Sequence, residues 1–318
     1  MFLFDTEQKV ASIGGIKIGG QPGENPTVLI GSMFHKGDRL IESRRERKFD
    51  REKAREYIRR QEELSLQTGV PGMMDIVANS GEEFKSYIDF FVESTDMPFA
   101  IDAWNLAPKL EAARFVAELG LVDRLLYNSI TPWGANNREE VAEIAAIGVK
   151  NVVLCVFDND DPTPSGRVNS LTKLMEVVRE GHFEGVLVDT SVLNLPSTSF
   201  TLLANYEVKK QFGLPTGCAV ANGTYAWKEA REKWDNWGFA GLDAAAHGIA
   251  AVLWSDFLLY GPAVNARWVF PAVAAADLMT SMLFYREAGA VPSNPGHPLH
   301  RLFPDFVDKL TNVNKLSG

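Results

Sequence analysis

Six short apolar runs in this sequence each end on an Asp or an Asn. Short apolar runs bounded by Gly, Pro and polar residues are typical of buried strands. If these strands are parallel, their carboxyl ends meet at one edge of the sheet, and the polar side chains converge there. The six runs end at Asp75 (GMMDIVAN), Asp102 (PFAIDAWN), Asn128 (RLLYNSI), Asp158 (VVLCVFDND), Asp189 (GVLVDTS) and Asn222 (GCAVANG).

A set of carboxylates and carboxamides favours one kind of ligand. Carboxylates accept hydrogen bonds, whereas amides both donate and accept them. Such a site suits a nitrogen-rich heterocycle with N–H donors beside carbonyl acceptors, and a pterin is a ligand of this kind. The alternative for each residue taken alone is a helix cap, because Asp or Asn after a strand often caps the next helix.

Other chemistries lack the residues that they need. No predicted strand ends on Lys, which disfavours Schiff-base chemistry. The five histidines are dispersed, with no H-x-H or H-E-x-x-H pair, so no bound metal is expected. There is no G-x-S-x-G elbow. The acidic run at 158–161 lacks the spacing and the Gly of a calcium loop and is predicted to be a polar turn between a strand and a helix.

The elements that must position these residues alternate between strand and helix. Eight strand-like runs are centred on Leu29, Met74, Ala100, Leu126, Val153, Leu187, Ala219 and Phe257. Predicted helices cover about 50–68, 81–95, 106–119, 137–147, 166–181, 197–212, 225–250, with a break near Trp237-Gly238, and 265–287. Strict alternation predicts an α/β fold, a (β/α)8 TIM barrel with its site at the carboxyl ends of the strands. A doubly wound open sheet is the alternative.

The two ends of the chain are expected to lie outside the barrel repeat. Residues 1–26 alternate around Ile13, Ile16 and Ile18 and predict a β-hairpin. Residues 27–288 form the predicted barrel, and 289–318 form a C-terminal helical extension, all in a single domain. The helix at 265–287 is apolar nearly all round, which predicts burial in the interface of a homodimer.

Composition limits the class of protein. The chain has 318 residues, is 46% apolar and carries a formal net charge of −9, which disfavours nucleic-acid binding. Its basic run at 44–48 is predicted to be a solvated loop. Cys155 and Cys218 are too few for a disulfide framework, and no signal peptide or membrane span is expected, so a soluble cytoplasmic protein is predicted.

Three segments resemble a known family. They are IGGIKIGGQPGENPTVLIGSMF near the N-terminus, RQEELS at 60–65 and YNSI at 127–130. The sequence resembles the H-subunit family of tetrahydromethanopterin S-methyltransferase over almost the whole chain. Within it, the likeness is greatest to corrinoid-dependent tetrahydrofolate methyltransferases of the glycine-betaine demethylation type. The family is similar to pterin-binding methyltransferases built on a (β/α)8 barrel.

The resemblance implies roles for the strand-end residues. Asp102 and Asp189 correspond to the acids that bind the amino-pyrimidine edge of the pterin, and Asn128 corresponds to the amide between them. Asn222 corresponds to the catalytic Asn near pterin N5, and Asp75 is a further pterin-binding residue. One departure is Trp104, in a segment where relatives tend to have a small hydroxyl residue after the acid; it either covers a ring face or marks a different pocket wall.

The implied enzyme is a methyltransferase that moves a methyl group between a protein-bound corrinoid and N5 of tetrahydrofolate, giving 5-methyltetrahydrofolate. The corrinoid is expected on a partner protein, because the segment at 180–185 is only a near match to the D-x-H-x-x-G motif of corrinoid carriers. The alternative within the class is the H component of the methanogen tetrahydromethanopterin complex. The alternatives outside it are a non-catalytic pterin-binding barrel and an unrelated barrel such as a phosphate-binding isomerase.

Overall fold

The chain folds into a closed barrel of parallel strands. The computed structural model describes residues 2–316, and within them eight strands form the barrel, with β12 pairing with β3 to close it. The (β/α)8 prediction is therefore confirmed, and the open sheet is excluded. The strands are β3 (Val28–Met33), β6 (Gly72–Val77), β7 (Phe99–Asp102), β8 (Leu125–Ile130), β9 (Asn151–Cys155), β10 (Gly185–Asp189), β11 (Thr216–Cys218) and β12 (Phe257–Pro262).

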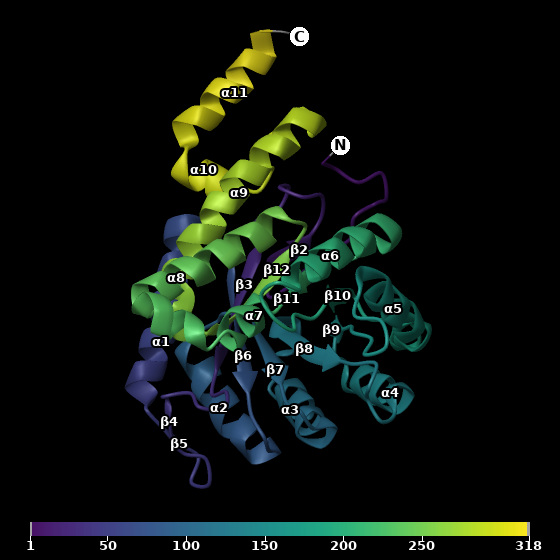
Figure 1. The fold of residues 1–318 in the computed structure, drawn as a ribbon. Helices are drawn as coiled ribbons and strands as arrows, with labels where there is room; N and C mark the ends of the chain where they lie inside the picture. The colour runs from purple at the N-terminus through teal and green to yellow at the C-terminus, as the bar shows by residue number, and fades with distance from the viewer. Residues whose placement is uncertain (1, 317–318) are drawn as a thin grey trace.

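Helices surround the barrel in chain order (Figure 1). In α1, Asp50 is the N-cap as predicted, since its side chain accepts from the backbone N–H of Lys53 at 3.0 Å. Gly69 ends the helix at φ 79°, a conformation that favours glycine. The helices are α1 (Arg51–Thr68), α2 (Gly81–Ser94), α3 (Leu106–Glu118), α4 (Asn137–Ile147), α5 (Pro164–Val178), α6 (Thr198–Phe212), α7 (Val220–Ala226), α8 (Glu229–Val252) and α9 (Ala266–Ala288).

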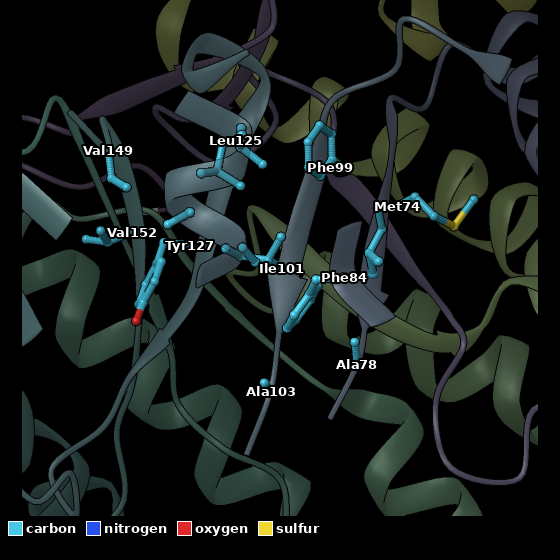
Figure 2. Close-up of a cluster of buried hydrophobic side chains, with 14 of the residues drawn as sticks. Met74, Ala78, Phe84, Phe99, Ile101, Ala103, Leu125, Tyr127, Val149 and Val152 are labelled. Atoms are coloured by element: carbon cyan, nitrogen blue, oxygen red, sulfur yellow. The ribbon is translucent and has the colours of Figure 1, made fainter. Parts of the chain in front are cut away.

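Hydrophobic clusters lie on both faces of the strands. The inner one fills the barrel and includes Met73, Ala100, Leu126, Val153 and Leu187. On the outer face, two clusters pack the strands against the helices. Figure 2 shows part of the larger outer cluster, with Phe99 and Ile101 of β7 and with Phe84 and Tyr127. Alternate residues along each strand therefore face the barrel interior.

The N-terminal β-hairpin closes one end of the barrel. It consists of β1 (Val10–Ile13) and β2 (Ile16–Gly19), which pair antiparallel, and Ile13 and Ile18 belong to the inner cluster. The backbone N–H of Gly14 donates to the carbonyl of Asp123 at 2.7 Å, just before β8. Because the hairpin covers the amino ends of the strands, a ligand would enter from the opposite, carboxyl end.

The predicted basic loop is the turn of a small hairpin. Its strands are β4 (Ile41–Ser43) and β5 (Lys48–Phe49). Arg44 forms an ion pair with Glu83 at 3.2 Å, and Arg47 pairs with Glu82. Both arginines therefore form ion pairs with acidic residues of α2.

The break in α8 and the end of the seventh strand differ from the predictions. The break in the helix α8 lies at Trp234 and Asp235, not at Trp237-Gly238. The seventh barrel strand ends at Cys218, and Ala219, its predicted centre, is already the N-cap of α7. Asn222 therefore lies in a helical turn that follows the strand directly.

The last helices form an arm on the outside of the barrel. The arm consists of α10 (Pro298–Leu302) and α11 (Pro304–Leu316), and α11 extends away from the barrel (Figure 1). Over its most apolar window, the segment Ala263–Ala288 has a mean hydropathy of 1.3, enough by length and composition to cross a membrane. It packs between α1 and α8, which accounts for part of that apolar character.

Candidate active site at the carboxyl ends of the strands

The last inward-facing residues of five neighbouring strands form a polar ring, which we call the mouth cluster. Each lies two positions after a residue of the inner hydrophobic cluster, so it faces the same side of its strand. Asp102, for example, lies two positions after the inward-facing Ala100, so its side chain points to the same face of β7. The mouth cluster consists of Asp75, Asp102, Asn128, Cys155 and Asp189.

Three of the predicted residues meet on one side of the mouth. The amide Nδ2 of Asn128 donates to Oδ1 of Asp75 over 3.5 Å, the outer limit for such a bond. Burial, and next the charge of Asp102, raise the pKa of Asp75 well above its usual range, although the Asn128 amide lowers it. Burial also raises the pKa of Asp102 to about 6, against the effect of the Lys109 ammonium. Asp102 is therefore mostly ionised at neutral pH, beside a carboxyl group that tends to keep its proton.

Asp189 lies on the other side with the thiol of Cys155. Burial raises the pKa of Asp189 to about 6, although the backbone N–H of Ser191, which donates to it at 2.8 Å, lowers it. The Sγ of Cys155 lies 3.2 Å from Oγ of Ser191. Burial, followed by the charge of Asp189, raises the pKa of the Cys155 thiol, so it stays a neutral thiol and a poor nucleophile.

A buried network from two helices supports the mouth cluster from outside. The Nζ of Lys109 (α3) donates to the backbone carbonyl of Ser129 and lies 3.3 Å from Oε1 of Glu140 (α4). The hydroxyl of Tyr127 donates to the same carboxylate at 2.7 Å. Lys109 thus fixes the end of β8 next to Asn128 and places a positive charge near Asp102.

Arg167 of α5 holds the loops that follow β9 and β10. Its side chain is fully buried, and its Nε donates to the carbonyl of Thr190 at 2.6 Å. Its other nitrogens donate to the carbonyls of Pro162, Thr163 and Ser191. The guanidinium therefore donates its hydrogen bonds to backbone carbonyls. Its positive charge also lowers the pKa of Asp189.

Asn222 and Trp104 lie at the same end of the barrel but outside the mouth cluster. Asn222 follows β11 in the first turn of α7 and is exposed. A side chain at the next residue, Gly223, would contact Val192 and Asn194, so α7 packs beside the loop after β10. Trp104 is 92% exposed in the loop after β7, so it does not form a wall around the carboxyl groups.

The capping alternative fails for the mouth cluster, because other residues cap the helices. Ser80 caps α2 and Asn136 caps α4 through their side chains. The prediction that Asp158 ends a strand was wrong. β9 ends at Cys155, and Asp158 accepts from the backbone N–H of Asp160 at 2.9 Å in the following turn. The acidic run is thus a polar turn, as predicted.

Sequence reasoning missed Lys109 and Ser191, and it treated Cys155 only as a strand residue. Cys155 could have been found from the alternation, since it lies two positions after Val153. The reach of Lys109 from α3 to the end of β8 leaves no local signal in the sequence.

The mouth cluster combines carboxyl groups of different pKa with one amide. Two carboxyl groups with a pKa of about 6 can accept from N–H donors at neutral pH, and Asn128 can donate to a carbonyl. Among residues 2–316, no group of three His, Cys, Asp or Glu is arranged to hold a metal ion. His182, in the near match to a corrinoid motif, is exposed just before β10, at the opposite end of the barrel.

Comparison with known sequences gives one family. Residues 6–291 match the model of the tetrahydromethanopterin S-methyltransferase MtrH subunit. The chain is 34% identical over 297 residues to the H subunit of tetrahydromethanopterin S-methyltransferase from Methanothermobacter marburgensis, which covers 88% of this chain and 94% of that protein. It is 33% identical to the H subunit of the putative methyltransferase mtx from Methanosarcina mazei, covering 88% of this chain and 93% of that protein.

Comparison with solved structures supports the fold alone. The chain is similar to a Yersinia pestis dihydropteroate synthase with a pterine-sulfa conjugate, with a TM-score of 0.61, 14% identity and coverage of 86% of this chain and 100% of that one. A dihydropteroate synthase of Xanthomonas albilineans gives a TM-score of 0.59 at 16% identity, covering 90% and 100%.

Proposed function

The chain belongs to the tetrahydromethanopterin S-methyltransferase MtrH subunit family, and from this premise we propose that it transfers a methyl group between N5 of a tetrahydropterin and a corrinoid carried by a partner protein. The observation that carries the proposal is the mouth cluster, in which acids and an amide on neighbouring strands face one another at the end of the barrel opposite the hairpin. A buried set of this kind needs N–H donors to satisfy it.

We assign the pterin ring to this cluster. Asp102 and Asp189 accept from the amino-pyrimidine N–H groups, and Asn128 bonds the neighbouring polar edge. The raised pKa of Asp75 favours its protonated form, which can donate to a ring nitrogen or carbonyl, and Asp75 can also orient Asn128 through their shared hydrogen bond.

Asn222 is the residue we assign to the reacting nitrogen. In transfer to the pterin, N5 must present its lone pair to the methyl carbon; in the reverse direction, N5 must be protonated before it can leave. A carboxamide serves both directions, because its oxygen can accept from N5–H while the N5 lone pair attacks the methyl carbon, and it can accept from protonated N5 before that nitrogen leaves. Asn222 is exposed beside the loop after β10, within the rim that a bound ring would approach. Catalysis then consists of positioning and electrostatic stabilisation.

The corrinoid supplies the cobalt that receives or donates the methyl group. We place it on a partner, and the loops after β7 and β8 at the rim of the mouth offer exposed Trp104 and Trp133 as contacts for that partner. These two strands are neighbours, so a partner that touches both residues lies over that side of the mouth.

The pterin we propose is tetrahydromethanopterin, because relatives that are similar over most of the chain are components of tetrahydromethanopterin S-methyltransferase. The expectation of tetrahydrofolate has no support from these relatives.

Isothermal calorimetry against tetrahydromethanopterin and tetrahydrofolate tests the proposal. We expect binding of the first, with tighter affinity than the second. Tighter binding of tetrahydrofolate would overturn the choice of pterin but keep the site, whereas no binding of either would overturn the proposed function.

A further inference from the structure

The first turn of α7, which carries Asn222, packs closely against the end of the barrel. Asn222 is the exposed residue between Ala221 and Gly223, which are both buried. A Cβ at Gly261 of β12 would come within 2.8 Å of the Cβ of Ala221, so the turn lies tightly against that strand. Within residues 2–316, the carboxamide of Asn222 itself has no hydrogen-bond partner. Its position therefore depends on what fixes the backbone of α7.

A buried hydrogen bond joins α7 to α8. The Oγ1 of Thr224 donates to Oδ1 of Asp243 at 2.6 Å, and its distance to the carbonyl of Ala221 is longer, 3.3 Å. Thr224 and Asp243 are both fully buried. The other carboxylate oxygen of Asp243 accepts from Nε1 of Trp268, in α9, at 2.8 Å. Because both oxygens are bonded, the Asp243 side chain is a fixed anchor, and loss of either bond would leave a buried acceptor unsatisfied.

A second hydrogen bond anchors the next residue of α7. The hydroxyl oxygen of Tyr225 accepts from Nδ2 of Asn265 at 2.9 Å. Asn265 is buried in the short turn between β12 and α9. The ring of Tyr225 also packs edge-on against Phe239 of α8, with 5.1 Å between the ring centroids. α7 is therefore anchored at two successive residues, directly after the turn that presents Asn222.

We infer that Asp243 and Asn265 are positioning residues for Asn222. They hold Thr224 and Tyr225, and thereby the turn of α7 that places the carboxamide at N5 of the pterin. This inference rests on the proposed function, in which Asn222 acts on N5. Both anchors are buried, so they act through α7 and not by contact with the pterin. Because a displacement of about 1 Å in the catalytic geometry can cost roughly 100-fold in rate, the anchors should affect kcat, whereas the mouth cluster provides the binding of the ring.

Three substitutions remove or restore the anchors. Thr224→Val keeps the shape of the side chain but removes the bond to Asp243, and Thr224→Ser keeps the hydroxyl that can form this bond. Tyr225→Phe removes the bond to Asn265 and keeps the ring that packs on Phe239. Since Tyr225→Phe loses only a hydroxyl at a partly exposed residue, it should fold even if Thr224→Val does not.

Thr27→Val is the matched control for stability. The Oγ1 of Thr27 donates to the buried carboxyl group of Asp277 at 2.9 Å, a bond of the same type as that of Thr224. Thr27 lies just before β3, at the amino end of the barrel, away from the site. Thr27→Val should lower the stability to denaturant about as much as Thr224→Val does, and its kcat should stay within about twofold of the unmodified protein, because the folded fraction remains near one.

Kinetics of methyl transfer and calorimetry of pterin binding provide the first test. Thr224→Val and Tyr225→Phe should each lower kcat roughly tenfold or more and change the pterin dissociation constant less than about twofold, and Thr224→Ser should recover most of the loss. Hydrogen exchange of the backbone amides at 219–227 should become faster in Thr224→Val but not in Thr27→Val. An unchanged kcat in both α7 variants, or an equal loss in Thr27→Val, would overturn the inference.

A double-mutant cycle separates failure of this inference from failure of the proposed function. If Thr224 acts through Asn222, Thr224→Val should change kcat less than about twofold in the Asn222→Ala background. A full, additive loss in that background would overturn the inference and leave methyl transfer in place. Full kcat in Asn222→Ala, or no transfer by the unmodified protein, would overturn the proposed function and this inference with it.

Discussion

Replacing Asp102 by Asn should halve the change in the logarithm of the pterin affinity between pH 7 and pH 5. Asp102 and Asp189 both have a pKa of about 6 and both must be ionised to accept from the ring N–H groups. A carboxyl group with this pKa is about nine-tenths ionised at pH 7 and about one-tenth ionised at pH 5, so each contributes roughly a tenfold loss of affinity on acidification. The unmodified protein should lose roughly 100-fold, and Asp102→Asn roughly tenfold.

The same substitution also lowers the affinity at pH 7. A hydrogen bond to a charged acceptor contributes roughly 1.5–3 kcal/mol, which corresponds to a loss of roughly 10- to 150-fold. Other charged groups near Asp102 are Asp75 on β6, Lys109 on α3 and Asp189 on β10. None of them is replaced by the substitution, although loss of the Asp102 charge removes one of the causes that raise the pKa values of Asp75 and Asp189.

Calorimetric titration of the tetrahydropterin at pH 5, 6, 7 and 8 measures both effects. Protonation of the pterin itself affects its binding to the unmodified protein and to each variant equally, so this effect cancels in the ratio of their affinities. Asp158→Asn is the matched control, because that carboxylate lies in the turn after β9 and accepts from backbone N–H groups. Equal pH slopes for the unmodified protein and Asp102→Asn would refute the role of Asp102, and an effect of Asp158→Asn of the same size would refute the specificity of the site.

Three further substitutions test separate parts of the structure. Asn222→Ala should lower kcat roughly 100-fold while the pterin dissociation constant from calorimetry changes little, because the amide acts on N5; equal losses in both would reassign it to binding. Lys109→Met removes the charge that lowers the pKa of Asp102, so the midpoint of the pH dependence of binding should move upward from about 6, and an unmoved midpoint would contradict this. Burial raises the pKa of Asp277 to about 8, so its contribution to stability is lost as pH rises from about 4 through 8. Asp277→Asn, whose amide can still bond Thr27, should reduce the loss in free energy of unfolding between pH 5 and pH 8 by roughly 4 kcal/mol in denaturant titrations; an unchanged pH dependence would contradict it.

The architecture could be predicted because it depends on local periodicity. Each barrel strand is a short apolar run, and the spacing of Ala54, Ile58 and Gln61 on α1 is that of a buried helical face. The same two-residue alternation places Asp75, Asp102, Asn128 and Asp189 inside the barrel.

The errors arose where strand ends were judged from composition alone. Asp158 closes an apolar run in the sequence, but the strand leaves the barrel three residues earlier, at Cys155. Asn222 was predicted after a longer strand, yet the chain turns into α7 directly after Cys218. In both places the boundary is set by pairing with neighbouring strands, which local sequence does not encode.

Contacts between distant segments were also beyond prediction. The bond from Lys109 to the carbonyl of Ser129 links a helix to the strand that follows it, and the position of the arm beside α1 depends on the bond from Arg301 to Leu66. Such contacts require knowledge of how the helices are arranged around the barrel.

The most direct test of the proposed function is visible spectroscopy of a methylated corrinoid protein mixed with this protein and tetrahydromethanopterin. We predict loss of the methylcorrinoid spectrum, with formation of methylated pterin in equal amount, only when all three are present, and a much slower reaction with Asn222→Ala. An unchanged spectrum with a protein that binds the pterin in calorimetry would contradict methyl transfer at this site.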